Sequence, residues 1–379
     1  MLDCQRHLFD LPAGLHYLNC AYMSPLPRAV EQAGIQGIRR KLDPSGISVA
    51  DFFRDSDTVR ERFGRLVGCE PARVALIPAV SYGMALVARA LRPERGGNIV
   101  LAGEQFPSNV YAWRSLAARD ALELRTVARS RDAGAGWTER VLACIDSATE
   151  LVALPQAHWT DGSLFDLERF GARARQVGAL FVVDGTQTVG AHPFDVRAVR
   201  PDALVCAGYK WLLGPYSLGV MYLGERFDDA QPLEETWIGR EASEDFRALV
   251  DYRDRYRQDA SRFDVGERSN FILVPMLAAA LEQLLEWGVA EVAAYCDRLN
   301  QRVARGAAEL GYQPVGGERC ANIVGVRAPV QADDALLDRL LAERRVFVSR
   351  RGDALRVSPH VYNDDADVDA LLEVLRAAL

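Results

Sequence analysis

Short apolar runs that alternate with helix-patterned stretches constrain the fold of this chain more than any other feature of its sequence. The strand-like runs are Asn98 to Leu101, Glu123 to Val127, Leu151 to Leu154, Phe181 to Val183 and Ala203 to Cys206. Strands and helices that alternate in this way form βαβ units, in which parallel strands are covered by the intervening helices. The sequence therefore predicts an α/β fold with a mostly parallel sheet.

The remaining segments predict how the chain is divided. We expect residues 1–25 to be an N-terminal segment that joins the small domain and the active site, residues 26–270 to be a large domain, and residues 271–379 to be a linking helix and a small C-terminal α/β domain. The stretch from Arg226 to Arg268 is charged and loses the βαβ rhythm, so we expect a loop that contacts a second subunit. A long helical pattern from about Val274 through Leu310 should then lead into the small domain.

Composition points to a cytoplasmic enzyme. A chain of 379 residues with 49% hydrophobic content can form a large core and a smaller domain, and its net charge of -7 argues against nucleic acid or an anionic membrane as partner. Residues 1–7 contain no apolar export signal, and the longest apolar run, from Phe271 to Leu281, is too short to span a bilayer. Seven scattered cysteines and five histidines show no ligand spacing. We expect a reducing compartment and no metal.

Lys210 is one of only two lysines in the chain, although lysine and arginine together number 45. Arginine can replace lysine as a surface charge, but its guanidinium group stays protonated and does not condense with an aldehyde. A lysine that survives in so arginine-rich a chain is therefore a candidate Schiff-base nucleophile.

Asp184 directly follows the apolar run from Ala179 to Val183, which predicts a buried parallel strand with a carboxylate at its C-terminal end. Open α/β sheets bind their ligands at this edge. The next strand leads to Lys210. An aspartate and a lysine at neighbouring strand ends suit pyridoxal 5'-phosphate, because the aspartate keeps the pyridine nitrogen protonated and the lysine holds the aldehyde carbon.

A phosphate site is expected at the start of the helix that begins near Ser81. A short strand, from Arg73 to Ile77, precedes this helix. The first N–H groups of a helix are free to bind an anion, and the hydroxyl group of Ser81 adds a donor.

These motifs resemble those of the class V aminotransferases of the type I pyridoxal-phosphate fold, which include cysteine desulfurases and kynureninases. The resemblance covers almost the whole chain and implies that fold, with a smaller C-terminal α/β domain. Asp184-Gly185-Thr186-Gln187 looks like the family's Asp-x-x-Gln/His box, which implies that Gln187 faces the phenolic oxygen of the cofactor. Tyr209-Lys210 matches a kynureninase pair, which implies a phosphate contact for Tyr209 and the Schiff base for Lys210.

The resemblance implies further cofactor contacts. Phe106, in Glu104-Gln105-Phe106-Pro107-Ser108-Asn109, should stack on the pyridine ring, although Asn109 departs from the family's aspartate. Tyr82 departs from a small residue and is expected to contact the phosphate through its backbone N–H. Trp237 and Asn270 match residues that, in kynureninase-like enzymes, come from the neighbouring subunit and close over the phosphate. This match implies a homodimer with shared active sites.

The segment from Ala354 to Asn363 resembles the family's Arg-x-Ser-x-His-x-Tyr-Asn motif, which implies that Arg356 holds the α-carboxylate of the substrate. The planar guanidinium fork suits a carboxylate and would orient the bonds at Cα. Asn19 lies in a segment similar to the family's pocket-entry segment. His158 and the residues that follow it are also expected to line the substrate pocket.

Together these residues predict an enzyme that removes a proton from Cα of a small amino-acid substrate, with Lys210 as the base. The shared residues do not choose between transamination, elimination and racemisation. We favour a kynureninase-like lyase or a transaminase, because the matches at Phe106, Tyr209, Trp237 and Asn270 lie on that side of the family.

Three other functions compete with this prediction. A cysteine desulfurase or selenocysteine lyase and an amino-acid epimerase remain as alternatives. Desulfurase activity needs a thiol before the carboxylate-binding arginine, but the loop from Val346 to Asp353 has none, and Cys320 lies too early in the small domain to be assumed equivalent. A non-catalytic scaffold is disfavoured because it has no need of a nucleophile such as Lys210.

Overall fold

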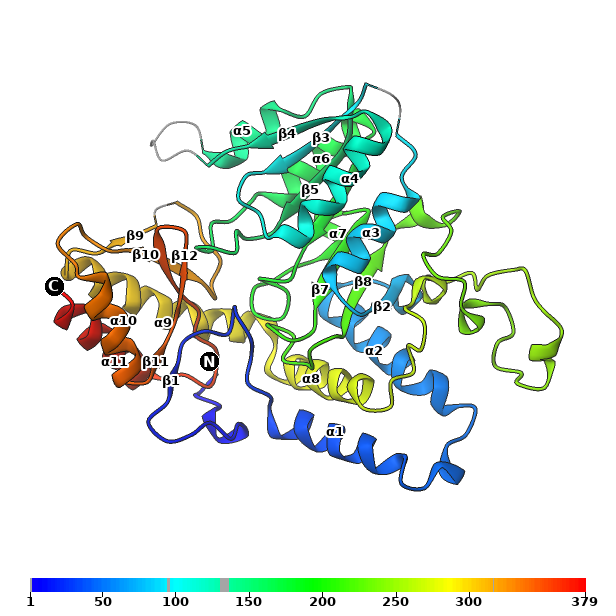
Figure 1. Ribbon diagram of the computed structural model, residues 1–379, viewed down its shortest axis with the longest axis horizontal. Helices are drawn as coiled ribbons and strands as arrows, with labels where there is room; N and C mark the ends of the chain where they lie inside the picture. Colours follow the sequence, from blue (N-terminus) through cyan, green and yellow to red (C-terminus); the bar gives the residue numbers. More distant parts are fainter. Residues whose placement is uncertain (1, 94–95, 130–135, 316) are drawn as a thin grey trace.

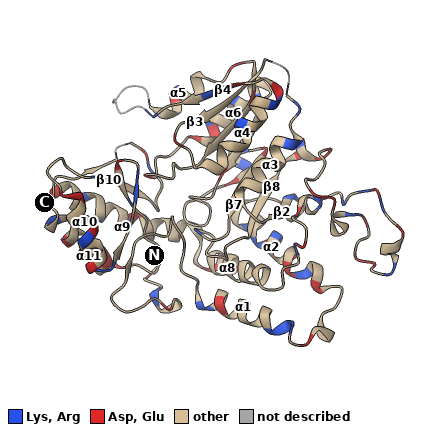
Figure 2. Cartoon of the chain, viewed as in Figure 1, with Lys and Arg blue, Asp and Glu red and all other residues tan. Residues whose placement is uncertain are grey.

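A computed structural model describes residues 2–93, 96–129, 136–315 and 317–379. The molecule has a large part built around one sheet and a smaller part that contains the C-terminus and lies against the N-terminal segment (Figure 1). The strands at the centre of the large sheet carry few charged residues, which lie mainly on the helices and loops around them (Figure 2).

The large sheet has seven strands in the order β2-β8-β7-β6-β5-β3-β4. They are β2 (Val74–Ile77), β3 (Asn98–Ala102), β4 (Glu123–Val127), β5 (Thr149–Pro155), β6 (Leu180–Asp184), β7 (Ala203–Ala207) and β8 (Gly219–Leu223). The prediction of a mostly parallel α/β sheet is confirmed, since only β8 runs antiparallel to its two neighbours. The sequence analysis missed β8, which follows the turn after Lys210.

Helices cover both faces of this sheet. In β7, Leu204 and Cys206 belong to the core on one face, whereas Val205 and Ala207 belong to the core on the other face. Burial on both faces is what makes parallel strands continuously apolar. The helices of the large part are α1 (Arg28–Arg40), α2 (Asp51–Val67), α3 (Val80–Ala90), α4 (Tyr111–Asp120), α5 (Trp137–Ala143), α6 (Leu167–Val177) and α7 (Val196–Val199).

The long helical pattern that the sequence predicted is broken into two helices. α8 (Leu273–Trp287) packs against α1 and α2, and α9 (Val289–Glu309) packs against the small sheet. Gly288 separates them with a φ of 77°, a conformation that glycine adopts easily. The two helix axes are bent by 77°. Within the described residues no single helix is long and apolar enough to cross a membrane, and only this bent pair meets the length and composition of a span.

The smaller part is an antiparallel sheet in the order β12-β13-β10-β9. Its strands are β9 (Gln313–Pro314), β10 (Val324–Arg327), β12 (Ser349–Arg351) and β13 (Ala354–Val357), and its other helices are α10 (Asp334–Glu343) and α11 (Asp365–Ala377). The N-terminal segment joins this part through β1 (His16–Tyr17), which pairs in parallel with β11 (Val346–Phe347). It also reaches the large part, because Ser24 N–H donates to the carbonyl of Tyr209.

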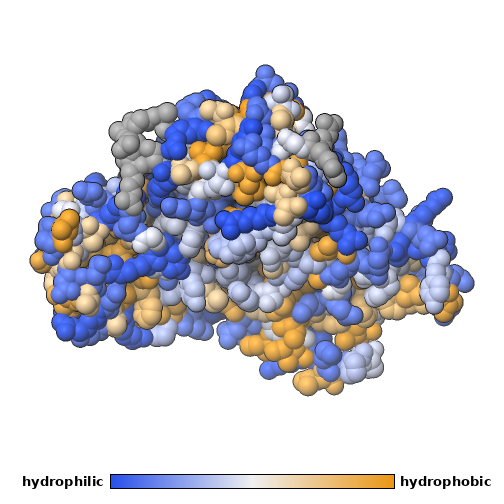
Figure 3. Space-filling view, turned by 45° about the horizontal axis from the view of Figure 1, so that its top comes forward, coloured by the Kyte–Doolittle hydropathy of each residue, from blue (hydrophilic) through white to orange (hydrophobic). Residues whose placement is uncertain are grey.

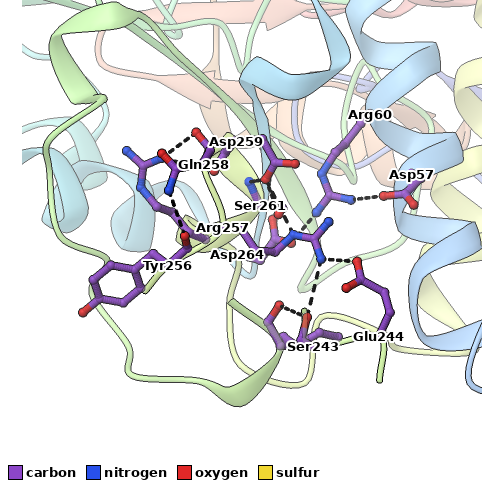
Figure 4. A network of polar contacts seen from close by, with 12 residues as sticks. Asp57, Arg60, Ser243, Glu244, Tyr256, Arg257, Gln258, Asp259, Ser261 and Asp264 are labelled. Atoms are coloured by element: carbon purple, nitrogen blue, oxygen red, sulfur yellow. Dashed lines mark hydrogen bonds and ion pairs between the residues drawn. The ribbon is translucent and has the colours of Figure 1, made fainter. Parts of the chain in front are cut away.

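Between β8 and α8 the chain forms only short 3₁₀ turns, as the loss of βαβ rhythm predicted. They are η5 (Glu225–Phe227), η6 (Trp237–Gly239), η7 (Ala248–Val250) and η8 (Ala260–Phe263). Part of this segment extends away from the rest of the chain at the right edge of Figure 1. Figure 4 shows how ion pairs and hydrogen bonds attach its later half to α2.

Candidate active site

A cavity of about 280 Å³ lies where the predicted strand ends meet. Six of the residues singled out in the sequence line it: Ser81, Phe106, Asp184, Gln187, Tyr209 and Lys210. β6 ends at Asp184 and β7 ends at Ala207, so the cavity is placed at the carboxyl edge of the parallel strands. This is the edge at which α/β sheets bind ligands.

Lys210 lies in the turn after β7 and is buried. Its Nζ is 5.0 Å from the centroid of the Phe106 ring and 5.4 Å from that of Tyr209. Burial and the positive charge of Arg356 lower the pKa of Lys210 to about 8, although Asp184 acts in the opposite direction. A neutral amine is therefore accessible near neutral pH, which suits both a nucleophile and a base.

Asp184 is the last residue of β6 and is buried. Its Oδ1 accepts a hydrogen bond of 3.0 Å from the backbone N–H of Thr186. Burial raises the pKa of Asp184, because the charged form loses its hydration. A cationic group in the cavity would restore the stability of the carboxylate.

Gln187 is held by hydrogen bonds at both ends of its amide. Its Oε1 accepts a hydrogen bond of 3.0 Å from the indole N–H of Trp211, and its Nε2 donates to the carbonyl of Ala21 at 3.2 Å. An amide has a second N–H, which can donate to an oxygen in the cavity. The indole can only donate, so the orientation of the amide is determined.

The N-terminus of α3 forms one end of the cavity. The cap residue, Ala79, offers no side-chain acceptor, and both Val80 and Ser81 line the cavity. Their N–H groups lie in the first turn, where a helix has no internal acceptor, so this end attracts an anion. We expected the backbone N–H of Tyr82 to contact the phosphate. In the structure this N–H donates to the carbonyl of Ala79 at 3.1 Å, and the Tyr82 ring packs against the core.

Arg356, in β13, is buried, and only some of the hydrogen-bond donors of its guanidinium group have acceptors in the described part of the protein. Its Nη1 donates to the carbonyl of Trp159 at 2.8 Å, but its Nε and Nη2 have no hydrogen-bond partner among the described residues. Burial and the nearby Arg351 lower the pKa of Arg356 to about 9. A carboxylate would supply both the missing acceptors and the missing negative charge.

The residues around Arg356 fasten the N-terminal segment. The Oγ of Ser358 accepts from Ala21 N–H at 3.1 Å, and Asn363 donates to the carbonyl of Tyr17 at 3.2 Å. Asn19 does not line the cavity. Its Oδ1 accepts from the hydroxyl of Ser349 at 2.8 Å, and the Cα of Ser349 pairs with that of Arg356.

His158 lies behind the cavity wall and does not line it. Its ring is fully buried, with Nδ1 2.7 Å from the hydroxyl of Thr160 and Nε2 3.2 Å from the carbonyl of Gly103. The next residue, Trp159, lines the cavity instead, and its ring meets that of Phe106 edge to face at 5.5 Å. The prediction that this segment lines the substrate pocket therefore applies to Trp159. The side chain of His158 points away from the cavity, toward Thr160 and the carbonyl of Gly103.

Trp237 and Asn270 are not brought to the cavity of their own chain. Trp237 is exposed and packs against Phe52 and Phe246 at 6.2 and 5.3 Å between ring centroids. Asn270 Oδ1 accepts hydrogen bonds from the first turn of α8, at Ile272 and Leu273. Within one chain, both residues belong to the surface beside α8.

The sequence analysis also missed residues that the fold brings to the cavity. Gln105 lines it and is fixed by donating to the carbonyl of Ala153 at 3.1 Å and accepting from Asn109 at 2.9 Å. Asn109 is therefore a structural residue here. Tyr216 lines the cavity because the chain turns back after Lys210, a turn for which the sequence pattern held no signal.

Residues 49–371 match the family Aminotransferase class-V. The chain belongs to this family. Among the curated relatives of this class V aminotransferase is an uncharacterized aminotransferase, YcbU, of Bacillus subtilis, with 27% identity over 98% of this chain and 96% of the relative. An isopenicillin N epimerase of Streptomyces clavuligerus is 27% identical over 95% of this chain and 94% of the relative.

Solved structures have the same fold. A cysteine desulfurase from Thermococcus onnurineus superposes with a TM-score of 0.86 at 21% identity, covering 100% of this chain and 98% of that one. A variant of the lyase C-DES, with glycine covalently linked to its PLP cofactor, has a TM-score of 0.83 at 20% identity and covers 98% and 99% of the two chains. The predicted type I pyridoxal-phosphate fold is confirmed.

The class V aminotransferase described here is a pyridoxal-phosphate-dependent enzyme. Its cavity fits that cofactor: the free N–H groups of α3 suit the phosphate, the buried carboxylate of Asp184 suits the ring nitrogen, and Lys210 suits the aldehyde. When bound, pyridoxal phosphate accepts electrons from Cα of an amino acid.

Proposed function

We propose that this protein is an aminotransferase whose amino-acid substrate is held by Arg356 and deprotonated at Cα by Lys210. The observation that carries this proposal is the unpartnered, buried edge of Arg356. A buried guanidinium edge without acceptors is costly, and an α-carboxylate satisfies it with two parallel hydrogen bonds. Arg356 donates to the carbonyl of Trp159, which lines the same cavity as Lys210, so a substrate held by Arg356 would lie near this base.

The cavity supports a reaction with one base. The titratable side chains among its described lining residues are Asp184, Tyr209, Lys210 and Tyr216. Burial raises the pKa of Tyr209, which therefore keeps its proton, and Asp184 is assigned to the ring nitrogen. Lys210 would remove the Cα proton and hold it for the proton shift that transamination requires.

One relative supports one of the two functions that the sequence predicts. The sequence predicts either a kynureninase-like lyase or a transaminase. The name of the Bacillus subtilis relative supports the transaminase. An amino-acid epimerase is the second candidate, because the Streptomyces clavuligerus relative is an isopenicillin N epimerase. Epimerisation would return the proton to the opposite face of Cα.

Sulfur transfer from cysteine is disfavoured by the positions of the thiols. The loop from Val346 to Asp353 has no cysteine. Cys320 is fully buried, and burial raises its pKa to about 12, so it is not available as a thiolate. A persulfide on this residue that is required for turnover, detected by mass spectrometry, would reverse this ranking.

The deciding experiment incubates the holoenzyme with single amino acids, in both enantiomers, in D₂O. Transamination predicts conversion of the bound cofactor to its amine form, followed by absorbance, with one oxo acid released per site. Deuterium incorporation with inversion, and no oxo acid, would assign an epimerase. Ammonia release with cleavage of a side-chain bond would assign a lyase, and a complete lack of spectral response would reject the proposal.

We also propose a cytoplasmic homodimer with shared active sites. Exposed Trp237 and Asn270 support it, since both match residues that kynureninase-like enzymes supply from a neighbouring subunit. Figure 3 shows apolar residues gathered along the lower edge of one face, which suits a contact with a second copy. The cytoplasmic location is proposed from the sequence, because seven scattered cysteines suit a reducing compartment.

A further inference from the structure

Arg351 is a second cation beside the substrate arginine, and the proposed function does not use it. It is the last residue of β12, and its guanidinium lies 5.6 Å from the centroid of the Trp159 indole ring. Arg356 donates to the main-chain carbonyl of the same tryptophan at 2.8 Å. The two guanidinium groups therefore contact two ends of one residue of the cavity wall.

Arg351 has no acidic partner among the described residues. Its hydrogen bond goes to the carbonyl of Arg350, at 2.7 Å. Arg350, which points to the other side of the strand, forms ion pairs with Asp334 and Asp338 of α10 at 3.0 and 2.9 Å. Helix α10 thus supplies carboxylates to the outward arginine, and the described residues supply none to the arginine beside Trp159.

Arg351 and Arg356 are both close enough to Lys210 to affect its charge. Arg351 lowers the pKa of Arg356, and both arginines lower the pKa of Lys210. A substrate with one carboxylate satisfies Arg356 and leaves Arg351 unpaired. Contact with the indole ring does not use the N–H groups of a guanidinium, and only Nη1 of Arg351 donates to the described part of the protein, at the carbonyl of Arg350, so its other N–H groups can bind a planar acid.

We propose that the amino-acid substrate carries a second acidic group in its side chain, which Arg351 binds while Arg356 binds the α-carboxylate. This inference rests on the proposed function, since it names the substrate class of the same site. Arg351 would then determine specificity, because a neutral side chain leaves its charge without a partner.

The test compares acidic amino acids with their amides. Aspartate and glutamate, asparagine and glutamine, and alanine are titrated into the holoenzyme, and the Kd is measured from the change in cofactor absorbance. The parent enzyme should bind the acids at least about tenfold more tightly than the amides, equivalent to about 1.4 kcal/mol. Arg351→Gln should abolish this preference without weakening the amides, and Arg351→Lys should keep part of it.

Arg350→Gln is the matched control, because it removes the neighbouring guanidinium from the outer side of the strand. It should leave the preference for acids unchanged. Equal weakening of acids, amides and alanine by Arg351→Gln would overturn the inference, and so would weaker binding of pyridoxal phosphate itself. A reaction with amino acids but no preference for acids would reject this inference alone, whereas no reaction with any amino acid would reject the proposed function as well.

Discussion

Asp184 is the buried carboxylate that we propose as the partner of the ring nitrogen of the cofactor. It lies at the end of β6, and burial raises its pKa although Thr186 donates a hydrogen bond to it. A protonated pyridine nitrogen at about 4 Å would interact with it by roughly 4 kcal/mol at an effective dielectric constant of about 20. The cofactor would gain its electron-accepting power from this contact.

We therefore predict that Asp184→Asn slows removal of the Cα proton by up to about a thousandfold, at about 1.36 kcal/mol per decade. Attachment of the cofactor should survive, because Lys210 is unchanged. Single-turnover proton exchange, with cofactor occupancy measured by absorbance, checks this expectation. A loss below about tenfold at full occupancy would make Asp184 a turn residue, with Thr186 as its only partner.

Lys210 supports a prediction about pH. The pKa of its amine is lowered to about 8, so the ammonium form, which cannot attack an aldehyde, prevails below that pH. Capture of pyridoxal phosphate by the apo-protein should accelerate as the pH rises and level off above about 8. Lys210→Arg should abolish capture at every pH. The control is Lys41→Arg, which changes the other, exposed lysine and should leave capture unchanged.

At the scale of elements, a buried ion cluster holds the segment before α8 against α2 and β2 (Figure 4). Asp264 is fully buried and pairs with Arg60 and Arg268, which are also buried. Its other oxygen accepts a hydrogen bond of 2.7 Å from the N–H of Leu76 in β2. The cluster therefore anchors the strand that leads into the phosphate end of the cavity.

Asp264→Asn should destabilise the protein by about 3–5 kcal/mol, because it leaves buried Arg268 without its ion-pair partner and buried Arg60 with only the exposed Asp57. Denaturant unfolding of the holoenzyme measures the change. Asp57→Asn is the control: Asp57 binds Arg60 at 2.8 Å, but its side chain is 59% exposed. Loss of such an exposed partner should cost about 0–1 kcal/mol. Equal effects of the two substitutions would mean that the cluster adds no more stability than a surface ion pair.

At the scale of the whole molecule, the surface around Trp237 and Asn270 suggests that a single chain has an incomplete site. If the partner closes each cavity, co-expression of Lys210→Ala and Trp237→Ala chains should give mixed dimers in which one site has both native residues. Their activity should exceed that of either variant alone. Activity equal to the average of the two separate variants would contradict shared sites, and sedimentation of the parent enzyme as a monomer would exclude them.

The local sequence pattern was sufficient to predict most strands of the large sheet and two of the candidate site residues. Short apolar runs predicted six of the seven strands of the large sheet, all except β8, and the rarity of lysine singled out Lys210. Asp184 could be predicted because the end of a parallel strand is also the edge of the sheet. These features depend on neighbouring residues in the chain, so they can be read without knowledge of the fold.

Tertiary structure decided whatever depends on contacts between distant segments. Gly288 bends a helical pattern that looked continuous, because α8 and α9 pack on different parts of the molecule. Trp159 rather than His158 lines the cavity, and Arg351 rather than Arg350 lies against the Trp159 ring. Each choice is between adjacent residues on opposite sides of the chain, and packing against segments far away in the sequence determines which side faces the site.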